Sequence, residues 1–84
     1  MGAFFRLYFL HNDETLTRLG MAVPKKAVPQ SVQRNRVKRL CREVFRQTHT
    51  LVAGDYVLVA QASAKTADNT ELKDELLKLL SRFS

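Results

Sequence analysis

The chain has 84 residues, a length that suits one domain with a modest core, because so short a chain buries only about 60% of its unfolded surface. Apolar residues make up 45% of it, as in globular proteins, and its single cysteine excludes a disulfide framework and a cysteine-based metal site. Its net charge of +6 favours a polyanionic partner. No apolar run reaches the ~18 residues of a membrane span and no signal-type segment opens the chain, so we expect a reduced, cytoplasmic setting without a membrane partner.

The first predicted element is a strand over Phe4–Leu10, which is short and rich in aromatic residues. Alternation places Phe5, Leu7 and Phe9 on one face, which suits a core. Arg6 and Tyr8 then share the other face, where an arginine beside an aromatic ring is compatible with stacking on unpaired bases. The plainer interpretation is that Tyr8 half-covers a sheet edge.

A polar hairpin is expected over His11–Thr17, because Asn12, Asp13 and Glu14 are typical turn residues. A histidine beside two acids also suggests metal or acid–base chemistry, but a solvated hairpin is the favoured interpretation. Arg18–Pro24 is then the returning strand. It turns Leu19, Met21 and Val23 to the core and leaves Gly20 and Ala22 beside Tyr8, where small residues would open a groove.

The longest predicted element is a basic helix over Ser31–Gln47, with Ser31 as its N-cap. Pro24 and Pro29 exclude a helix through the preceding link. One apolar stripe is formed by Val37, Leu40, Cys41, Val44 and Phe45. The opposite side carries Arg34, Asn35, Lys38, Arg39, Arg42 and Arg46.

Charge is concentrated in and just before this helix. From Lys25 to Arg46 there are eight basic residues against Glu43 alone, a local charge of +7 that exceeds the total. Arg34, Lys38 and Arg42 follow one another at i, i+4 and i+8, a row that costs a few tenths of a kcal/mol per like-charged pair. A solvated basic face is the plain interpretation. The arginine-rich row with Asn35 in it favours a phosphate-binding surface instead.

The last third of the chain predicts one strand and one helix. After a turn at Gly54-Asp55, the apolar run Tyr56–Ala60 predicts a strand that is buried on both faces or nearly so. Ala62–Asn69 is a loop, and Thr70–Phe83 is an amphipathic helix that Asp68 and Glu71 can cap. We therefore expect a single domain over residues 1–84 of the α/β class. It is a two-layer α+β arrangement, in which a small mixed sheet of three to four strands packs with the basic helix and the C-terminal helix.

The basic helix resembles that of the bacterial ribonuclease P protein subunit. That family carries a Lys-Lys pair at the end of a strand and then a helix reading Arg-Asn-Arg-x-x-Lys/Arg-Arg-x-x-Arg-Glu; this chain has Lys25-Lys26 and then Arg34–Glu43. Residues 4–26 and 53–80 also fit the family's layout. Family members usually begin with a further helix, which is expected to be absent here because the sequence opens at the first strand.

The resemblance implies a protein component of ribonuclease P, an endoribonuclease that removes the 5′ leader of precursor tRNA. Its catalyst is an RNA that uses Mg²⁺, so neither catalytic residues nor a bound cofactor or metal, nor an obligate protein partner, is implied for this chain. The protein binds the catalytic RNA and holds the leader in a cleft between the basic helix and the sheet. By this resemblance we expect Tyr8 and Arg6 to bind the leader. The residues expected to bind RNA are Lys25, Lys26, Arg34, Asn35, Arg36, Lys38, Arg39, Arg42 and Arg46.

Two other functions are compatible with the composition. A DNA-binding module needs only charge and a helix, but the basic face offers few base-reading side chains besides Asn35, and the two prolines before the helix oppose a helix-turn-helix. A nuclease acting by itself is disfavoured, because none of the eight acidic residues shows a metal-site spacing joined to a histidine.

Overall fold

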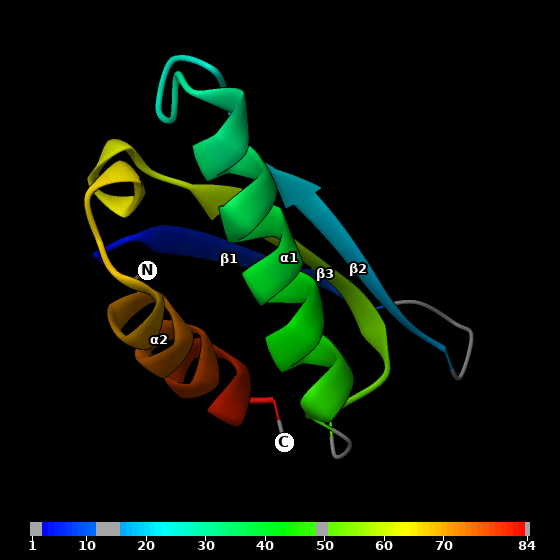
Figure 1. Cartoon of the computed structure of the whole chain (residues 1–84). Coiled ribbons are helices and arrows are strands. Elements are labelled where there is room, and N and C mark those ends of the chain that lie inside the picture. The colour runs from blue at the N-terminus through cyan, green and yellow to red at the C-terminus, as the bar shows by residue number, and fades with distance from the viewer. Residues whose placement is uncertain (1–2, 12–15, 49–50, 84) are drawn as a thin grey trace.

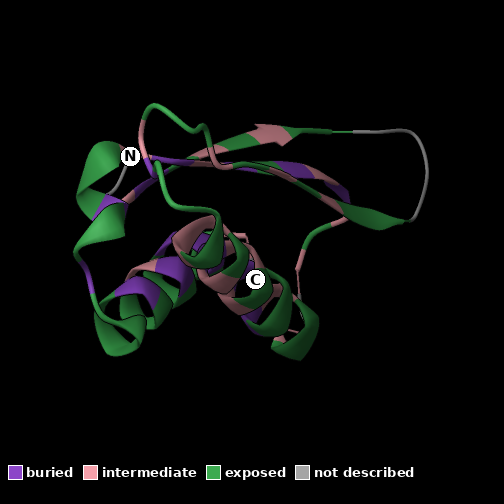
Figure 2. Cartoon of the chain, turned by 45° about the horizontal axis from the view of Figure 1, so that its top comes forward, coloured by how far each residue is buried: buried purple, intermediate pink, exposed green. Residues whose placement is uncertain are grey.

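The computed structural model describes residues 3–11, 16–48 and 51–83, in which a three-stranded sheet carries two helices on one face (Figure 1). Figure 2 shows the two layers, with the sheet above the helices. This is the two-layer α+β fold expected from the sequence. The elements in chain order are β1 (Phe5–Leu10), β2 (Thr17–Ala22), α1 (Ser31–Gln47), β3 (Gly54–Ala60), the short 3₁₀ helix η1 (Ala62–Lys65) and α2 (Asn69–Ser81).

The strand order is β1-β3-β2, so the last strand in the sequence is the central one. β3 pairs antiparallel with β1 and parallel with β2. The predicted hairpin between the first two strands is therefore wrong in its pairing, and residues 12–15 of its turn lie outside the described residues. A parallel pair needs a long crossover connection, which α1 supplies between β2 and β3.

The register gives the sheet one buried and one open face. Phe5, Tyr56 and Leu58 lie on the helix side and are at most 1% exposed. On the other side, Val57 is 38% exposed. Figure 2 shows both helices below the sheet and neither on its upper face. The prediction that this strand is buried on both faces or nearly so is wrong at Val57, because both helices pack against the other side of the sheet.

Gly54 begins β3 and does not form the predicted turn. A Cβ atom at this position would lie 2.6 Å from Cζ of Phe9, so the aromatic ring occupies the space that a side chain would need. The glycine is required by this close approach across the β1–β3 pair.

The bounds predicted for α1 are confirmed at both ends, but its cap is not. Gln30 is the N-cap residue, without a side-chain capping hydrogen bond, and Ser31 is already helical. The predicted apolar stripe faces the core, with Val37, Cys41 and Val44 buried and the other two members partly buried. Within the described ranges, no helix combines the length and apolar content needed to cross a bilayer.

The second helix is held at its start by the predicted pair of acids. Asp68 accepts a hydrogen bond from the Glu71 backbone at 2.8 Å, and the Glu71 carboxylate accepts one from the Asp68 backbone at 3.2 Å, a complete capping box. Leu72, Leu76, Leu79 and Leu80 are buried along its inner side. α2 thus closes the core over β1 and α1.

Two ionisable groups of the described residues, the Cys41 thiol and the Tyr56 phenol, are buried in this core. Burial raises the pKa of the Cys41 thiol from its ordinary 9.0 to about 12, and the neighbouring Arg42 charge offsets part of that effect. Burial also raises the pKa of the Tyr56 phenol. Both groups therefore hold their protons more tightly in the folded chain than in the unfolded one.

We expect the fold to lose stability at alkaline pH. The contribution of Cys41 is fully present below pH 9 and is lost as the pH rises towards 12, because there the unfolded thiol ionises while the folded one stays protonated. Urea unfolding from pH 7 to 11 measures the decline, and Cys41→Ala should make it shallower. Parallel declines for the two proteins would contradict the assignment.

Glu75 of α2 holds the beginning of β1. Its carboxylate accepts hydrogen bonds from the backbone N–H groups of Ala3, Phe4 and Phe5, at 2.6, 2.8 and 2.8 Å. Three backbone donors, each 70 or more residues from Glu75 in the sequence, thus share its carboxylate as their acceptor. The edge strand and the C-terminal helix are tied together by this contact.

Glu75→Gln should therefore destabilise the domain by about 1–3 kcal/mol, since an amide is a weaker acceptor and its NH₂ group opposes the three donors. Asp74→Asn is the matched control, because Asp74 is an exposed acid on the same helix. Denaturant midpoints measure both changes. Equal midpoints would show that the carboxylate contributes nothing specific.

Candidate nucleic-acid interface

The outward side of α1 carries a polycationic surface, which we call the helix surface and define as Asn35, Lys38, Arg39, Arg42 and Arg46. Lys38 is partly buried and the other four are exposed. In the described part of the chain, no side chain of this set has a hydrogen bond or an ion pair with the protein. The side chains line a hollow of about 720 Å³ that also includes Glu43, the only acid of the helix. Unpaired guanidinium and ammonium groups in a row are suited to bind consecutive phosphates.

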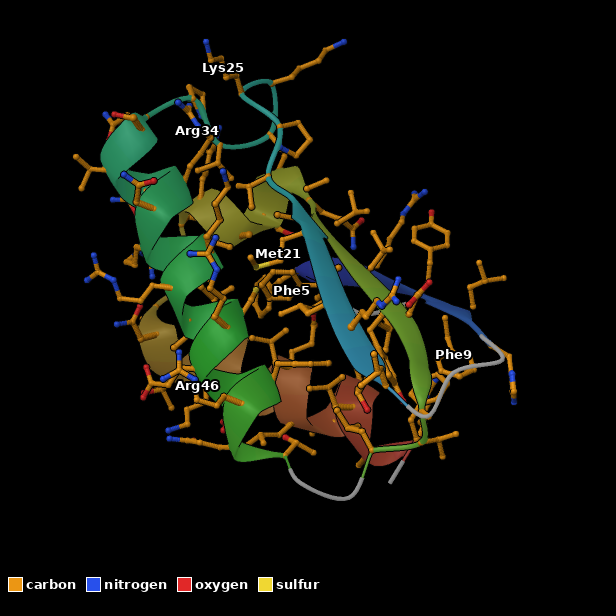
Figure 3. The ribbon with its side chains drawn as sticks, turned by 90° about the vertical axis from the view of Figure 1, so that its right-hand side faces the viewer. Phe5, Phe9, Met21, Lys25, Arg34 and Arg46 are labelled. Atoms are coloured by element: carbon orange, nitrogen blue, oxygen red, sulfur yellow. The ribbon has the colours of Figure 1, made fainter. Side chains whose placement is uncertain are left out.

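Arg34 begins the predicted row, but its guanidinium turns back towards the chain before the helix. It donates to the carbonyl oxygens of Val28 and Pro29, at 3.1 and 2.7 Å, and is partly buried. Those carbonyls belong to the link between β2 and α1, in which Lys25 and Lys26 are both exposed. Figure 3 shows Lys25 beyond the start of α1. Arg34 thereby connects the lysine pair to the helix.

Arg36 also donates hydrogen bonds within the protein, on another side of α1 from Arg34. It donates to Gln33 Oε1 at 2.8 Å, to Asn69 Oδ1 at 2.6 Å and to the Ala67 carbonyl at 3.2 Å. These partners join α1 to the segment that begins α2. Both arginines that flank Asn35 thus make internal hydrogen bonds, whereas Asn35 itself is exposed.

The predicted leader-binding residues lie on the open face of the sheet, which we call the sheet surface and define as Arg6, Tyr8, Gly20, Ala22 and Val57. Tyr8 pairs with Val57 and Val57 with Gly20, so the three form a row across the strands. Tyr8 is 53% exposed. Gly20 does lie on the same face, but Val57 separates it from Tyr8, so they are not neighbours as predicted.

The predicted cleft between the basic helix and the sheet does not contain Tyr8. α1 packs against the buried face of the sheet (Figure 2), whereas the strand register and its 53% exposure put Tyr8 on the opposite face. The helix surface and the sheet surface therefore lie on opposite sides of the sheet. Val57 was missed as part of the sheet surface, although alternation with the buried Tyr56 and Leu58 would have placed it there.

No metal site accompanies these surfaces in residues 3–11, 16–48 and 51–83, where no three His, Cys, Asp or Glu side chains are grouped to hold an ion. The fold and the two surfaces define a small basic α+β domain. Comparison with known proteins identifies the family of this domain. The family model of ribonuclease P matches residues 1–84, so the chain belongs to the bacterial ribonuclease P protein family.

Two bacterial relatives illustrate the similarity. The chain is 46% identical over 74 residues to the ribonuclease P protein component of Vibrio cholerae, covering 87% of this chain and 63% of that protein. It is 39% identical over 79 residues to that of a Psychrobacter species, covering 93% and 61%. The chain thus spans a little over three fifths of these relatives' own length.

Solved structures of the family share the fold. The ribonuclease P protein of Thermotoga maritima has a TM-score of 0.85 at 28% identity, with 100% of this chain and 81% of that one covered. A Staphylococcus aureus ribonuclease P protein mutant with defective mRNA degradation activity has a TM-score of 0.87 at 28% identity, with 100% and 74% covered. The mixed sheet with two helices on one side is therefore the fold of this family.

Arg36 and Arg39 allow the internal and the solvent-facing arginines of α1 to be compared. Arg36→Ala should destabilise the domain by about 1–3 kcal/mol, because it leaves the Ala67 carbonyl and Asn69 without their donor. Arg39→Ala should change stability by less than about 0.5 kcal/mol and lower the salt slope of RNA binding by about one unit. Denaturation and binding at several salt concentrations measure both. A reversed pattern would mean that Arg36 binds RNA and Arg39 supports the fold.

Proposed function

We propose that this chain is the protein component of ribonuclease P, which binds the catalytic RNA and the 5′ leader of precursor tRNA and so assists maturation of the tRNA 5′ end. The observation that carries the proposal is the helix surface. Five neighbouring side chains of α1, four of them cationic, have no partner within the described residues. Such a surface supplies affinity for a nucleic-acid backbone without demanding a sequence.

In this proposal the helix surface binds the catalytic RNA. Asn35, Lys38, Arg39, Arg42 and Arg46 contact its phosphates, and Lys25 and Lys26 extend the contact beyond the start of the helix. Arg34 and Arg36 support this surface through their internal hydrogen bonds. The donors left unused by those bonds remain available to RNA, since a guanidinium carries five N–H groups.

The sheet surface is assigned to the leader. Tyr8 presents an aromatic ring on which a base of a single strand can stack, and Arg6 lies two residues away on the same face. Gly20 has no side chain, so the sheet surface beside Val57 is flat at this position. An added Cβ would lie 3.6 Å from Val57 Cγ2, which is an ordinary contact, so packing alone does not require glycine here. A low apolar floor with a ring at its side suits an extended strand of nucleotides.

Catalysis is assigned to the RNA partner. Mg²⁺ would be bound by that RNA and would supply the activated water and the stabilisation of the leaving oxygen. The chain contributes binding and orientation of the two RNAs. We place the complex in the cytoplasm, where precursor tRNA is found in bacteria.

Reconstitution tests the proposal. Adding the chain to a bacterial ribonuclease P RNA at low Mg²⁺ should restore cleavage of precursor tRNA at the 5′ end of the mature sequence. The chain alone should cleave neither precursor tRNA nor an mRNA fragment. The mRNA arm is included because a Staphylococcus aureus relative is described by its mRNA degradation activity. Cleavage by the protein without RNA would contradict the assignment of catalysis.

Tyr8→Ala separates the two surfaces. It should weaken holoenzyme binding of precursor tRNA by about 1–3 kcal/mol, the value of one stacked base, and leave mature tRNA binding and assembly with the catalytic RNA unchanged. Tyr8→Phe is the matched control, because it keeps the aromatic face and should be mild. Both affinities are measured for the three proteins. Equal weakening for precursor and mature tRNA would remove Tyr8 from the leader site.

A further inference from the structure

A second groove lies on the buried side of β2, between that strand and the C-terminal half of α1. It has a volume of about 470 Å³, within the range of ~300–1,000 Å³ of small-molecule sites. Its apolar lining comes from both elements and the segment after α1: Leu19, Met21, Phe45 and Leu51, all partly buried. In Figure 3, Met21 lies in the space between α1 and β2.

The rim of this groove is cationic. Arg42 and Arg46 line it, both are exposed, and neither has a hydrogen bond or an ion pair with another described residue. The same two arginines also line the hollow of the helix surface. A backbone bound along the helix surface would therefore run past the mouth of the groove.

These features select the chemistry of the ligand. A partly buried aromatic ring, a thioether and two leucines favour a flat, apolar group, since methionine makes good contacts with aromatic rings. Two unpartnered guanidinium groups at the mouth favour a phosphate attached to that group. A nucleotide combines both parts, and one that is not base-paired has its ring free to enter.

We propose that the groove between α1 and β2 holds one unpaired nucleotide of the catalytic RNA, its base against Met21 and Phe45 and its phosphate at Arg42 and Arg46. This site rests on the proposed function and adds a position at which the protein binds a base as well as the backbone. It is distinct from the sheet surface, because Met21 and Tyr8 lie on opposite faces of the sheet.

The methyl group of Met21 can report by NMR whether a ligand occupies the groove. The sequence has two methionines, so ¹³C-methyl labelling gives at most two signals, and Met21→Leu assigns the one from the groove. Titration of the full chain with adenosine 5′-monophosphate should move that signal upfield and saturably, because the base lies over the methyl group. Ribose 5-phosphate, which has the phosphate but no base, should not.

The two arginines are tested with a matched pair of double variants. Arg42→Gln with Arg46→Gln should weaken the adenosine monophosphate titration at least about fivefold. Lys73→Gln with Lys78→Gln removes the same charge from the exposed side of α2 and should leave it unchanged. Absence of a shift at Met21, the same shift with ribose 5-phosphate, or equal weakening by both variants would overturn the proposal.

Crosslinking in the holoenzyme identifies the RNA. A photoreactive benzoylphenylalanine at Thr17, on the rim of the groove, should crosslink to an unpaired position of the catalytic RNA, whereas one at Leu77, exposed on α2, should not. Crosslinks from Thr17 to precursor tRNA alone, or equal crosslinking from both sites, would overturn it. Reconstituted cleavage is measured separately from these tests. If the holoenzyme is active but the groove shows neither the Met21 shift nor the Thr17 crosslink, this inference is wrong and the proposed function still stands.

Discussion

Tyr56 is the side chain on which the arrangement of the layers depends. Its ring lies 4.9 Å from that of Phe9 in β1, 5.6 Å from Phe45 in α1 and 5.4 Å from Phe83 after α2. Its hydroxyl donates to the carbonyl of Val52, so the buried polar atom is satisfied. One residue of the central strand thus contacts the edge strand and the ends of both helices. The helix surface keeps its position relative to the sheet because α1 packs against this cluster.

The arginines of α1 divide into two groups with different physical roles. Arg34 and Arg36 donate to carbonyl and amide oxygens of neighbouring segments, whereas Arg39, Arg42 and Arg46 point away from the core. A guanidinium is suited to the first role because its five N–H donors are spread over a rigid planar fork, whereas a lysine offers three donors at a single nitrogen. In a chain of 84 residues without disulfides, such contacts connect elements that the small core holds weakly.

The sequence predicts local features of this structure better than distant ones. The bounds of α1 and the capping of α2 follow from residues three or four apart, and both are confirmed. The pairing of β1 with β3 was missed, because a polar segment between two apolar strands looks the same whether or not a third strand later inserts between them. The internal bonds of Arg34 and Arg36 were missed for a similar reason: Asn69 is 33 residues from Arg36. The side of the sheet on which Tyr8 stands followed from alternation, but its separation from α1 depends on the crossover.

The strand order also determines when the sheet can form during synthesis. β1 and β2 each pair only with β3 among the described strands, and β1 meets residues about fifty positions later in the chain. Until Ala60 has left the ribosome, the apolar segment Phe5–Leu10 has no strand to pair with, and only α1 can gain its hydrogen bonds locally. Such distant pairing slows folding and leaves an aggregation-prone strand exposed in the meantime. Among the described elements, α1 is thus the first that can complete its own hydrogen bonds as the chain emerges.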